Sequence, residues 1–199
     1  MSKELIIIAG PNGAGKTTFA MQLIDEGIIQ HFINADEIAK SLVDVPTELR
    51  NIHAGKLFLQ RLNAAVVLQQ TVCFETTLSG LSYLKRIQNL KQNGWTVTLH
   101  YLALENVNLS KQRVEERVLH GGHNIPAQDI ERRFPKSVYN LFYHYIDAVD
   151  EVYCYLNMIE PQRIFSKNQN EFVITNHQHY ENLKGIADEY HRDQTIRKP

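Results

Sequence analysis

The sequence predicts an α/β fold in which a mostly parallel, five-stranded sheet is flanked by helices. Short apolar runs bounded by polar turns alternate along the chain with stretches of helical periodicity, which is typical of a parallel sheet covered on both faces. The chain has 199 residues, enough for one well-buried α/β domain and short for two. We therefore expect a single domain over residues 1–199.

The individual elements follow from these patterns in chain order. Apolar runs predict strands at residues 4–9, 31–35, 71–76, 95–103 and 151–156. Helical periodicity predicts helices at residues 16–26, 36–42, 47–69, 81–93, 109–120, 127–145 and 180–190. Pro135 is expected to split or kink the sixth helix near Phe134, because proline lacks a backbone donor. Residues 162–175 predict a small hairpin, which together with the last helix forms a C-terminal addition.

The composition excludes some classes of protein. A net charge of −1 and a pI near 6.8 provide no global basic field, which argues against a protein built mainly to bind nucleic acid. The two cysteines, Cys73 and Cys154, lie in apolar runs and are expected to be reduced core residues. The N-terminal apolar stretch is too short for a signal peptide, and no run reaches membrane-spanning length. We expect a cytoplasmic protein with no membrane partner.

A glycine-rich segment, GPNGAGKT, follows the first apolar run directly and precedes an amphipathic helix. This spacing and context predict a P-loop, whose backbone N–H groups and helix N-terminus bind phosphate. Lys16 would contact the β- and γ-phosphates of ATP, and the Thr17 hydroxyl would bind Mg²⁺. The alternative is a chance glycine-rich turn before an ordinary helix. The expected nucleotide-binding residues are Gly10, Pro11, Asn12, Gly13, Ala14, Gly15, Lys16, Thr17 and Thr18.

Asp36 follows the second expected strand, at the sheet edge where ligands bind in open α/β folds. A carboxylate there is suited to accept the proton of an attacking hydroxyl, or to hold that hydroxyl in line with the γ-phosphate. The structural alternative is that Asp36 is the N-cap of the next helix. We predict a catalytic and substrate-binding role for Asp36.

The third expected strand ends in FETTLSG, which brings Glu75 and Thr77 to the same edge. Glu75 there would bind Mg²⁺, or it would contact hydroxyls of the phosphoryl acceptor together with Thr77. Ser79 is a further candidate contact to the acceptor. The alternative for all three is an ordinary strand-to-helix connection.

Four arginines surround a Gly-Gly pair at residues 121–122, between two expected helices. A hinged, arginine-bearing segment is what a kinase lid requires, since guanidinium groups stabilise the charge of the transferring phosphoryl. We predict this lid over about residues 106–134. The alternative is a solvated helical pair, because four acidic side chains in residues 111–136 accompany six basic ones. The arginines are Arg113, Arg117, Arg132 and Arg133.

Together these segments resemble a known family. GPNGAGKTTF, INADEIA, FETTLSG and RVEERVLHGGHNIP with IERRF resemble the zeta-toxin-like kinases, in particular the small chromosomal branch of predicted ATPases or UDP-N-acetylglucosamine kinases. The resemblance runs from about Ile6 to Asp150. It implies a P-loop kinase fold that uses ATP and Mg²⁺ to phosphorylate a hydroxyl of a nucleotide-sugar.

The resemblance also implies roles for residues. The catalytic aspartate of the family corresponds to Asp36, its substrate-binding pair to Glu75 and Thr77, and its lid arginines to Arg117 and to Arg132 or Arg133. The chain departs from the family at Ser79, where the toxin branch has a basic residue. It also departs after the fifth strand, where Leu156-Asn157-Met158 replaces an Asp-Asn-Ser run. An antitoxin protein is a candidate partner, although these residues do not establish one.

Three functions remain open at the level of sequence. The first is a kinase for UDP-N-acetylglucosamine or a related nucleotide-sugar, in which Asp36, Lys16, Arg117, Arg132 and Arg133 are catalytic. The second is a kinase for another hydroxyl acceptor, such as a nucleoside, an antibiotic or a polynucleotide end. The third is an NTP-dependent switch that binds a partner protein. Asp36 favours a kinase, since a switch needs a residue that positions water.

Overall fold

The computed structural model describes residues 3–122, 124–158 and 161–196 of the chain. All its strands join one mixed sheet in the order β2-β3-β1-β4-β5-β6-β7. The strands are β1 (Glu4–Ala9), β2 (His31–Ile33), β3 (Val72–Thr76), β4 (Thr96–Ala103), β5 (Glu151–Asn157), β6 (Pro161–Lys167) and β7 (Phe172–Ile174). The helices are α1 (Lys16–Asp25), α2 (Ala35–Ser41), α3 (Thr47–Val67), α4 (Leu84–Gln92), α5 (Val107–Leu119), α6 (Ala127–Asn140), the π-helix η1 (Leu141–Tyr145) and α7 (His177–Ile196).

The first five strands are parallel, as the alternating pattern predicts. The expected hairpin is present as β6 and β7, and it is part of the main sheet. β6 pairs antiparallel with β5 and β7 with β6, so the sheet formed by the described residues has seven strands rather than the five expected. This extension covers the edge of β5, which would otherwise expose unpaired backbone groups.

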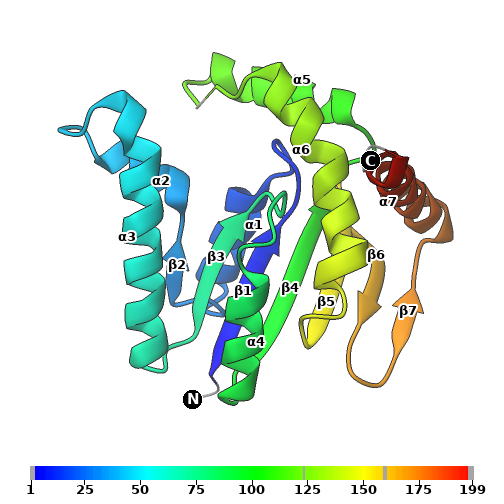
Figure 1. Cartoon of the computed structure of the whole chain (residues 1–199), viewed down its shortest axis with the longest axis horizontal. Coiled ribbons are helices and arrows are strands. Elements are labelled where there is room, and N and C mark those ends of the chain that lie inside the picture. The colour runs from blue at the N-terminus through cyan, green and yellow to red at the C-terminus, as the bar shows by residue number, and fades with distance from the viewer. Residues whose placement is uncertain (1–2, 123, 159–160, 197–199) are drawn as a thin grey trace.

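The central strand β1 carries the core, since residues 5–9 are buried. Helices cover both faces of the sheet: α4 and α6 lie in front of it in Figure 1, and α1 lies behind. Neighbouring side chains of β4 show the two faces, because His100 packs on Phe19 of α1 whereas the Tyr101 hydroxyl contacts Ser137 of α6. The carboxyl ends of the parallel strands point to the top of Figure 1, where α2 and α5 lie.

Pro135 does not split its helix. α6 runs through it to Asn140 and continues as the π-helix. The buried side chains Ile130, Phe134 and Val138 recur at helical spacing across the proline. Burying three such side chains yields about 1.5–3 kcal/mol each, which exceeds the cost of about 3 kcal/mol for an interior proline. The packing of these side chains therefore outweighs the tendency of Pro135 to break the helix.

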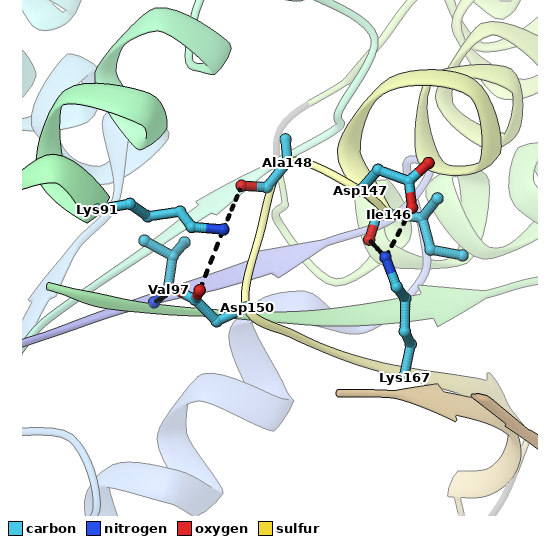
Figure 2. Close-up of polar contacts among 7 residues, drawn as sticks. All are labelled: Lys91, Val97, Ile146, Asp147, Ala148, Asp150 and Lys167. Atoms are coloured by element: carbon cyan, nitrogen blue, oxygen red, sulfur yellow. Dashed lines mark hydrogen bonds and ion pairs between the residues drawn. The ribbon is translucent and has the colours of Figure 1, made fainter. Parts of the chain in front are cut away.

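The connection from the π-helix into β5 is held by two lysines (Figure 2). Lys91 of α4 donates to the Ala148 carbonyl over 3.1 Å and pairs with Asp150 over 3.0 Å. The other Asp150 oxygen accepts the backbone N–H of Val97 at 2.9 Å. Lys167 of β6 donates to the Ile146 carbonyl at 2.7 Å. These contacts fix β5 against β4 at the end of the sheet remote from the P-loop.

Candidate active site

A cavity of about 400 Å³ lies at the carboxyl ends of the parallel strands. It is lined by the P-loop, the first residues of α2, the end of β3, and side chains from α5 and α6. Segments that are far apart in the sequence therefore meet at one place, as the expected fold requires. Most of the residues that the sequence singled out lie around this cavity.

The P-loop turns into α1 through Gly15, whose φ of 79° lies in the left-handed region. Lys16 points back along the loop, and its ammonium donates to the carbonyls of Gly10 at 3.0 Å and Pro11 at 2.9 Å. Burial lowers the pKa of Lys16, while the carboxylates of Glu75 and Asp36 oppose that shift. The loop thus presents a cation close to two carboxylates in the same cavity.

Thr17, Glu75 and Asn34 form a hydrogen-bonded chain across the floor of the cavity. The Thr17 hydroxyl donates to Oε2 of Glu75 at 2.9 Å, and the Asn34 amide donates to Oε1 at 3.1 Å. Burial raises the pKa of Glu75, and Lys16 with the Thr17 hydroxyl acts against this. Both carboxylate oxygens are therefore held in fixed directions.

Asn34, and not Asp36, caps α2. The Asn34 side-chain oxygen accepts the backbone N–H groups of Asp36 at 2.8 Å and Glu37 at 3.2 Å. The capping role considered for Asp36 is consequently taken by Asn34, two residues earlier. Asp36 is exposed and lines the cavity, and within the described ranges its carboxylate has no hydrogen bond or ion pair. Its oxygens are free for a substrate.

The FETTLSG segment is held by a hydrogen bond from α6, on the side away from the cavity. Leu78 has a φ of 57°, and its carbonyl accepts the buried Asn140 amide at 2.7 Å. Thr77 lines the cavity and shares a 2.9 Å hydrogen bond with the Ser79 hydroxyl. Ser79 itself does not line the cavity, and its hydroxyl is linked to the cavity through the Thr77 hydroxyl.

The expected lid residues separate into two groups. Arg113, Arg117 and Arg133 line the cavity. Arg132 does not: its side chain is 62% exposed and pairs with Asp129 at 2.7 Å. On the same turn, Arg133 lies 3.6 Å from Asp129. Of the two arginines left open by the resemblance, only Arg133 faces the cavity.

The Gly-Gly pair, where a hinge was expected, ends α5 in a hydrogen-bonded turn. Gly121 has a φ of 81° and donates to the Val118 carbonyl at 3.0 Å, and Gly122 donates to the Arg117 carbonyl at 2.9 Å. These two bonds form a Schellman cap. A Cβ on Gly122 would lie 2.8 Å from the Arg117 carbonyl oxygen, so a larger residue would disturb the turn that carries Arg117. Residue 123, within the expected lid, lies outside the described residues.

The oxygen atoms present fit a Mg²⁺ ion that is bound together with a triphosphate. Thr17 Oγ1 and Glu75 are hard oxygen ligands within 2.9 Å of each other, and a hydroxyl that donates its proton to a carboxylate leaves its lone pairs for a metal. In the described part of the chain, no group of three or more His, Cys, Asp or Glu side chains could hold a metal alone. A P-loop Mg²⁺ site does not need one, since phosphate oxygens complete it.

Sequence reasoning missed Asn34 and Tyr83 as residues that line the cavity. Asn34 lies two residues before Asp36, and an Asn between a strand and a helix is itself a capping signal. Tyr83 lines the cavity beside Thr76 and packs against Phe74 with ring centroids 4.8 Å apart. The helical spacing of Tyr83 gives no sign of which way it faces. Arg113, one of the four arginines of the expected lid, also lines the cavity.

Comparison with known proteins decides the family. The sequence profile of the zeta toxin family matches residues 1–179. The chain belongs to the zeta toxin family. A relative from Haemophilus influenzae, an uncharacterized protein, is 30% identical over 134 residues, which are 67% of this chain and 94% of that protein. The resemblance inferred from the motifs is confirmed.

Solved structures confirm the fold. A chain of the AvrRxo1-ORF1:ORF2 crystal structure with ATP superposes with a TM-score of 0.74 at 17% identity and covers 92% of this chain. The chain described here spans only 63% of the length of that AvrRxo1 chain. A chain of the PezAT chromosomal toxin–antitoxin system of Streptococcus pneumoniae gives a TM-score of 0.63 at 16% identity. The match covers 99% of this chain and 88% of the PezAT chain. The crystal structure of a putative kinase from Chloroflexus aurantiacus has the same fold, with a TM-score of 0.55 at 18% identity over 67% of this chain and 78% of that one. Among the described residues, no helix is both long and apolar enough to span a membrane.

Proposed function

We propose that this zeta toxin family member is an ATP- and Mg²⁺-dependent kinase that transfers the γ-phosphoryl group to a hydroxyl of a nucleotide-sugar, with UDP-N-acetylglucosamine as the acceptor. One observation carries the proposal. A single cavity is lined by the P-loop, by the uncommitted carboxylate of Asp36 and by three arginines. That combination suits phosphoryl transfer, in which catalysis consists mainly of positioning and charge stabilisation.

The P-loop side of the cavity supplies the donor half of the site. The backbone N–H groups of the loop and the N-terminus of α1 bind phosphate, and Lys16 exchanges its carbonyl contacts for phosphate oxygens. Thr17 and Glu75 would hold Mg²⁺, which when bound neutralises charge on the β- and γ-phosphates. The ATP-bound AvrRxo1 structure supports ATP as the donor.

The opposite side of the cavity supplies the acceptor half. Asp36 accepts a hydrogen bond from the attacking hydroxyl and takes its proton as the new bond to phosphorus forms. Thr77 contacts other polar groups of the acceptor. Arg113, Arg117 and Arg133 stabilise the charge of the transferring group, so each functional part has a candidate side chain.

A kinase for a different hydroxyl acceptor is the second candidate, and Ser79 is the observation that favours it. The toxin branch has a basic residue at this position, which would suit an anionic substrate. Here a neutral hydroxyl pairs with Thr77. A less strongly charged acceptor would match that change.

An antitoxin protein as partner is also part of the proposal. The PezAT relative comes from a toxin–antitoxin system, and the matched AvrRxo1 chain was crystallised in a two-protein complex. A partner that covers the cavity would inhibit the enzyme by excluding substrate.

The experiment that tests the proposed function is an acceptor panel. The protein is incubated with ATP, Mg²⁺ and UDP-N-acetylglucosamine, nucleosides or oligonucleotide 5′ ends, and products are identified by mass spectrometry. We expect a phosphorylated product with UDP-N-acetylglucosamine that the Lys16→Ala variant does not form. A product with a different acceptor would select the second candidate. ATP hydrolysis without any phosphorylated acceptor would overturn the kinase assignment in favour of a switch.

A further inference from the structure

Two side chains from outside the P-loop motif hold backbone carbonyls of the loop. The Ser110 hydroxyl of α5 donates to the Asn12 carbonyl over 2.6 Å, and Ser110 is fully buried. The Asn157 amide, at the end of β5, donates to the Ala14 carbonyl, also over 2.6 Å. The two donors come from different elements and hold alternate peptide groups of the same loop.

The geometry of the peptide unit converts these contacts into an orientation of N–H groups. A peptide is planar and trans, so the carbonyl of one residue and the N–H of the next point in opposite directions. Fixing the Asn12 carbonyl therefore fixes the N–H of Gly13, and fixing the Ala14 carbonyl fixes the N–H of Gly15. Both glycines line the cavity. Within the described ranges, neither N–H donates a hydrogen bond to another group of the chain.

Close packing reinforces both contacts. A Cβ on Gly13 would lie 3.0 Å from the Ser110 carbonyl oxygen and equally close to the Arg113 Cβ. A Cβ on Gly15 would lie 2.5 Å from Asn157 Nδ2. Both distances are shorter than ordinary van der Waals contacts, so a side chain at Gly13 would press on α5 and one at Gly15 would displace the Asn157 amide from the loop.

We propose that Ser110 and Asn157 are positioning residues for the triphosphate, each orienting one N–H of the phosphate-binding loop from behind. The inference rests on the proposed nucleotide site and deepens it. Preorganised N–H groups bind phosphate without the cost of reorienting the backbone on binding. Ser110 also lies on the helix that carries Arg113 and Arg117, so the same hydrogen bond sets the P-loop against the arginines.

The test compares Ser110→Ala and Asn157→Ala with the unchanged protein. Binding of ATP and of ADP is measured by isothermal titration calorimetry, and thermal unfolding is followed without nucleotide. Loss of one orienting hydrogen bond is expected to weaken binding of both nucleotides by about three- to tenfold. The two effects should multiply in the double variant, since the residues act on separate peptide groups. The KM for ATP should rise while the KM for the acceptor stays unchanged.

Ser137→Ala is the matched control. Ser137 of α6 is likewise fully buried, and its hydroxyl is hydrogen-bonded to that of Tyr101 on β4 at 2.9 Å. We expect this variant to lose thermal stability but to bind ATP normally. Because Asn157 is only half-buried, Asn157→Ala tests the inference even where Ser110→Ala does not fold.

Unchanged nucleotide affinity in Asn157→Ala, or an equal loss of affinity in Ser137→Ala, would overturn the inference while leaving the proposed function intact. Failure of the unchanged protein to bind either nucleotide would overturn the proposed function and this inference together.

Discussion

The Thr17 hydroxyl donates a hydrogen bond to Oε2 of Glu75 over 2.9 Å, joining the first turn of α1 to the end of β3. This contact ties the P-loop to the strand that pairs with β1. It also leaves two roles for Glu75, as a metal ligand or as a contact to the acceptor. A variant that removes the charge and keeps the size of the side chain separates them.

Glu75→Gln keeps a hydrogen-bond acceptor for Thr17 but loses the carboxylate that Mg²⁺ prefers. We expect ATP binding to persist and the Mg²⁺ concentration for half-maximal rate to rise about tenfold or more. The measurement is the initial rate against Mg²⁺ concentration at saturating acceptor. An unchanged Mg²⁺ requirement with a raised KM for the acceptor would assign Glu75 to the acceptor instead.

Asp36→Asn removes the base and preserves the shape of the side chain. Because Asn34 caps α2, the substitution should not unfold that helix. We expect ATP affinity to be retained and kcat to fall by about 100-fold or more, the usual range for loss of a general base. Calorimetry and steady-state rates measure the two quantities. Near-normal turnover would exclude Asp36 from the mechanism.

The two adjacent lid arginines should behave differently. Arg133 lines the cavity, whereas Arg132 faces solvent and pairs with Asp129. Arg133→Ala should lower kcat by about 100-fold, as removal of a donor to developing charge does. Arg132→Ala should stay within about twofold of the unchanged protein, because exposed ion pairs contribute little. The reverse order of kcat values would mean that the helix turns when substrate binds.

The lysine-held connection shown in Figure 2 allows a stability test remote from the cavity. The Asp150 side chain is 15% exposed and accepts the N–H of the buried Val97. Asp150→Ala should lower the free energy of unfolding by about 1–3 kcal/mol, because that N–H loses its partner. Asp147, 85% exposed and paired with Lys167, is the control. Asp147→Ala should change the free energy by about 0.5 kcal/mol or less in urea unfolding; equal losses would contradict this account.

His100 predicts a pH dependence of stability. Its ring stacks on Tyr153 with centroids 5.4 Å apart, its Nδ1 is buried without a partner among the described residues, and burial lowers its pKa to about 4. As pH falls below about 6.5, the unfolded chain takes up a proton that the folded protein resists until about pH 4. Stability contributed by this group is therefore lost on acidification through that window.

The measurement is urea unfolding of the unchanged protein and of His100→Phe, which keeps an aromatic ring, at pH 7 and pH 5. The unchanged protein should lose up to about 2 kcal/mol more than the variant between these two values. An equal loss of unfolding free energy in the two proteins would show that His100 does not contribute to the pH dependence.

Much of the fold and part of the site could be predicted from sequence because their signals are local. The P-loop is contiguous, so Lys16 and Thr17 were found directly, and the parallel core followed from alternating runs. The pairing of β6 with β5 is a tertiary contact that a hairpin pattern alone does not specify. That α6 continues through Pro135 depends on the buried face of the helix, which the local proline signal does not describe.

Contacts between distant residues set the rest of the site. Ser110 lies 98 residues from Asn12, and Asn157 lies 143 residues from Ala14. No spacing rule relates such pairs before the chain is folded. The sequence also does not show which of Arg132 and Arg133 points into the cavity, because adjacent residues of a helix point in different directions.

The transfer of the γ-phosphoryl group tests the central claim most directly. The protein is incubated with γ-labelled ATP, Mg²⁺ and UDP-N-acetylglucosamine as the sole acceptor, and the label is followed into separated products. The account predicts label on the nucleotide-sugar, lost in Lys16→Ala and reduced about 100-fold in Asp36→Asn. Label found in inorganic phosphate alone, at the same rate with and without the acceptor, would contradict it.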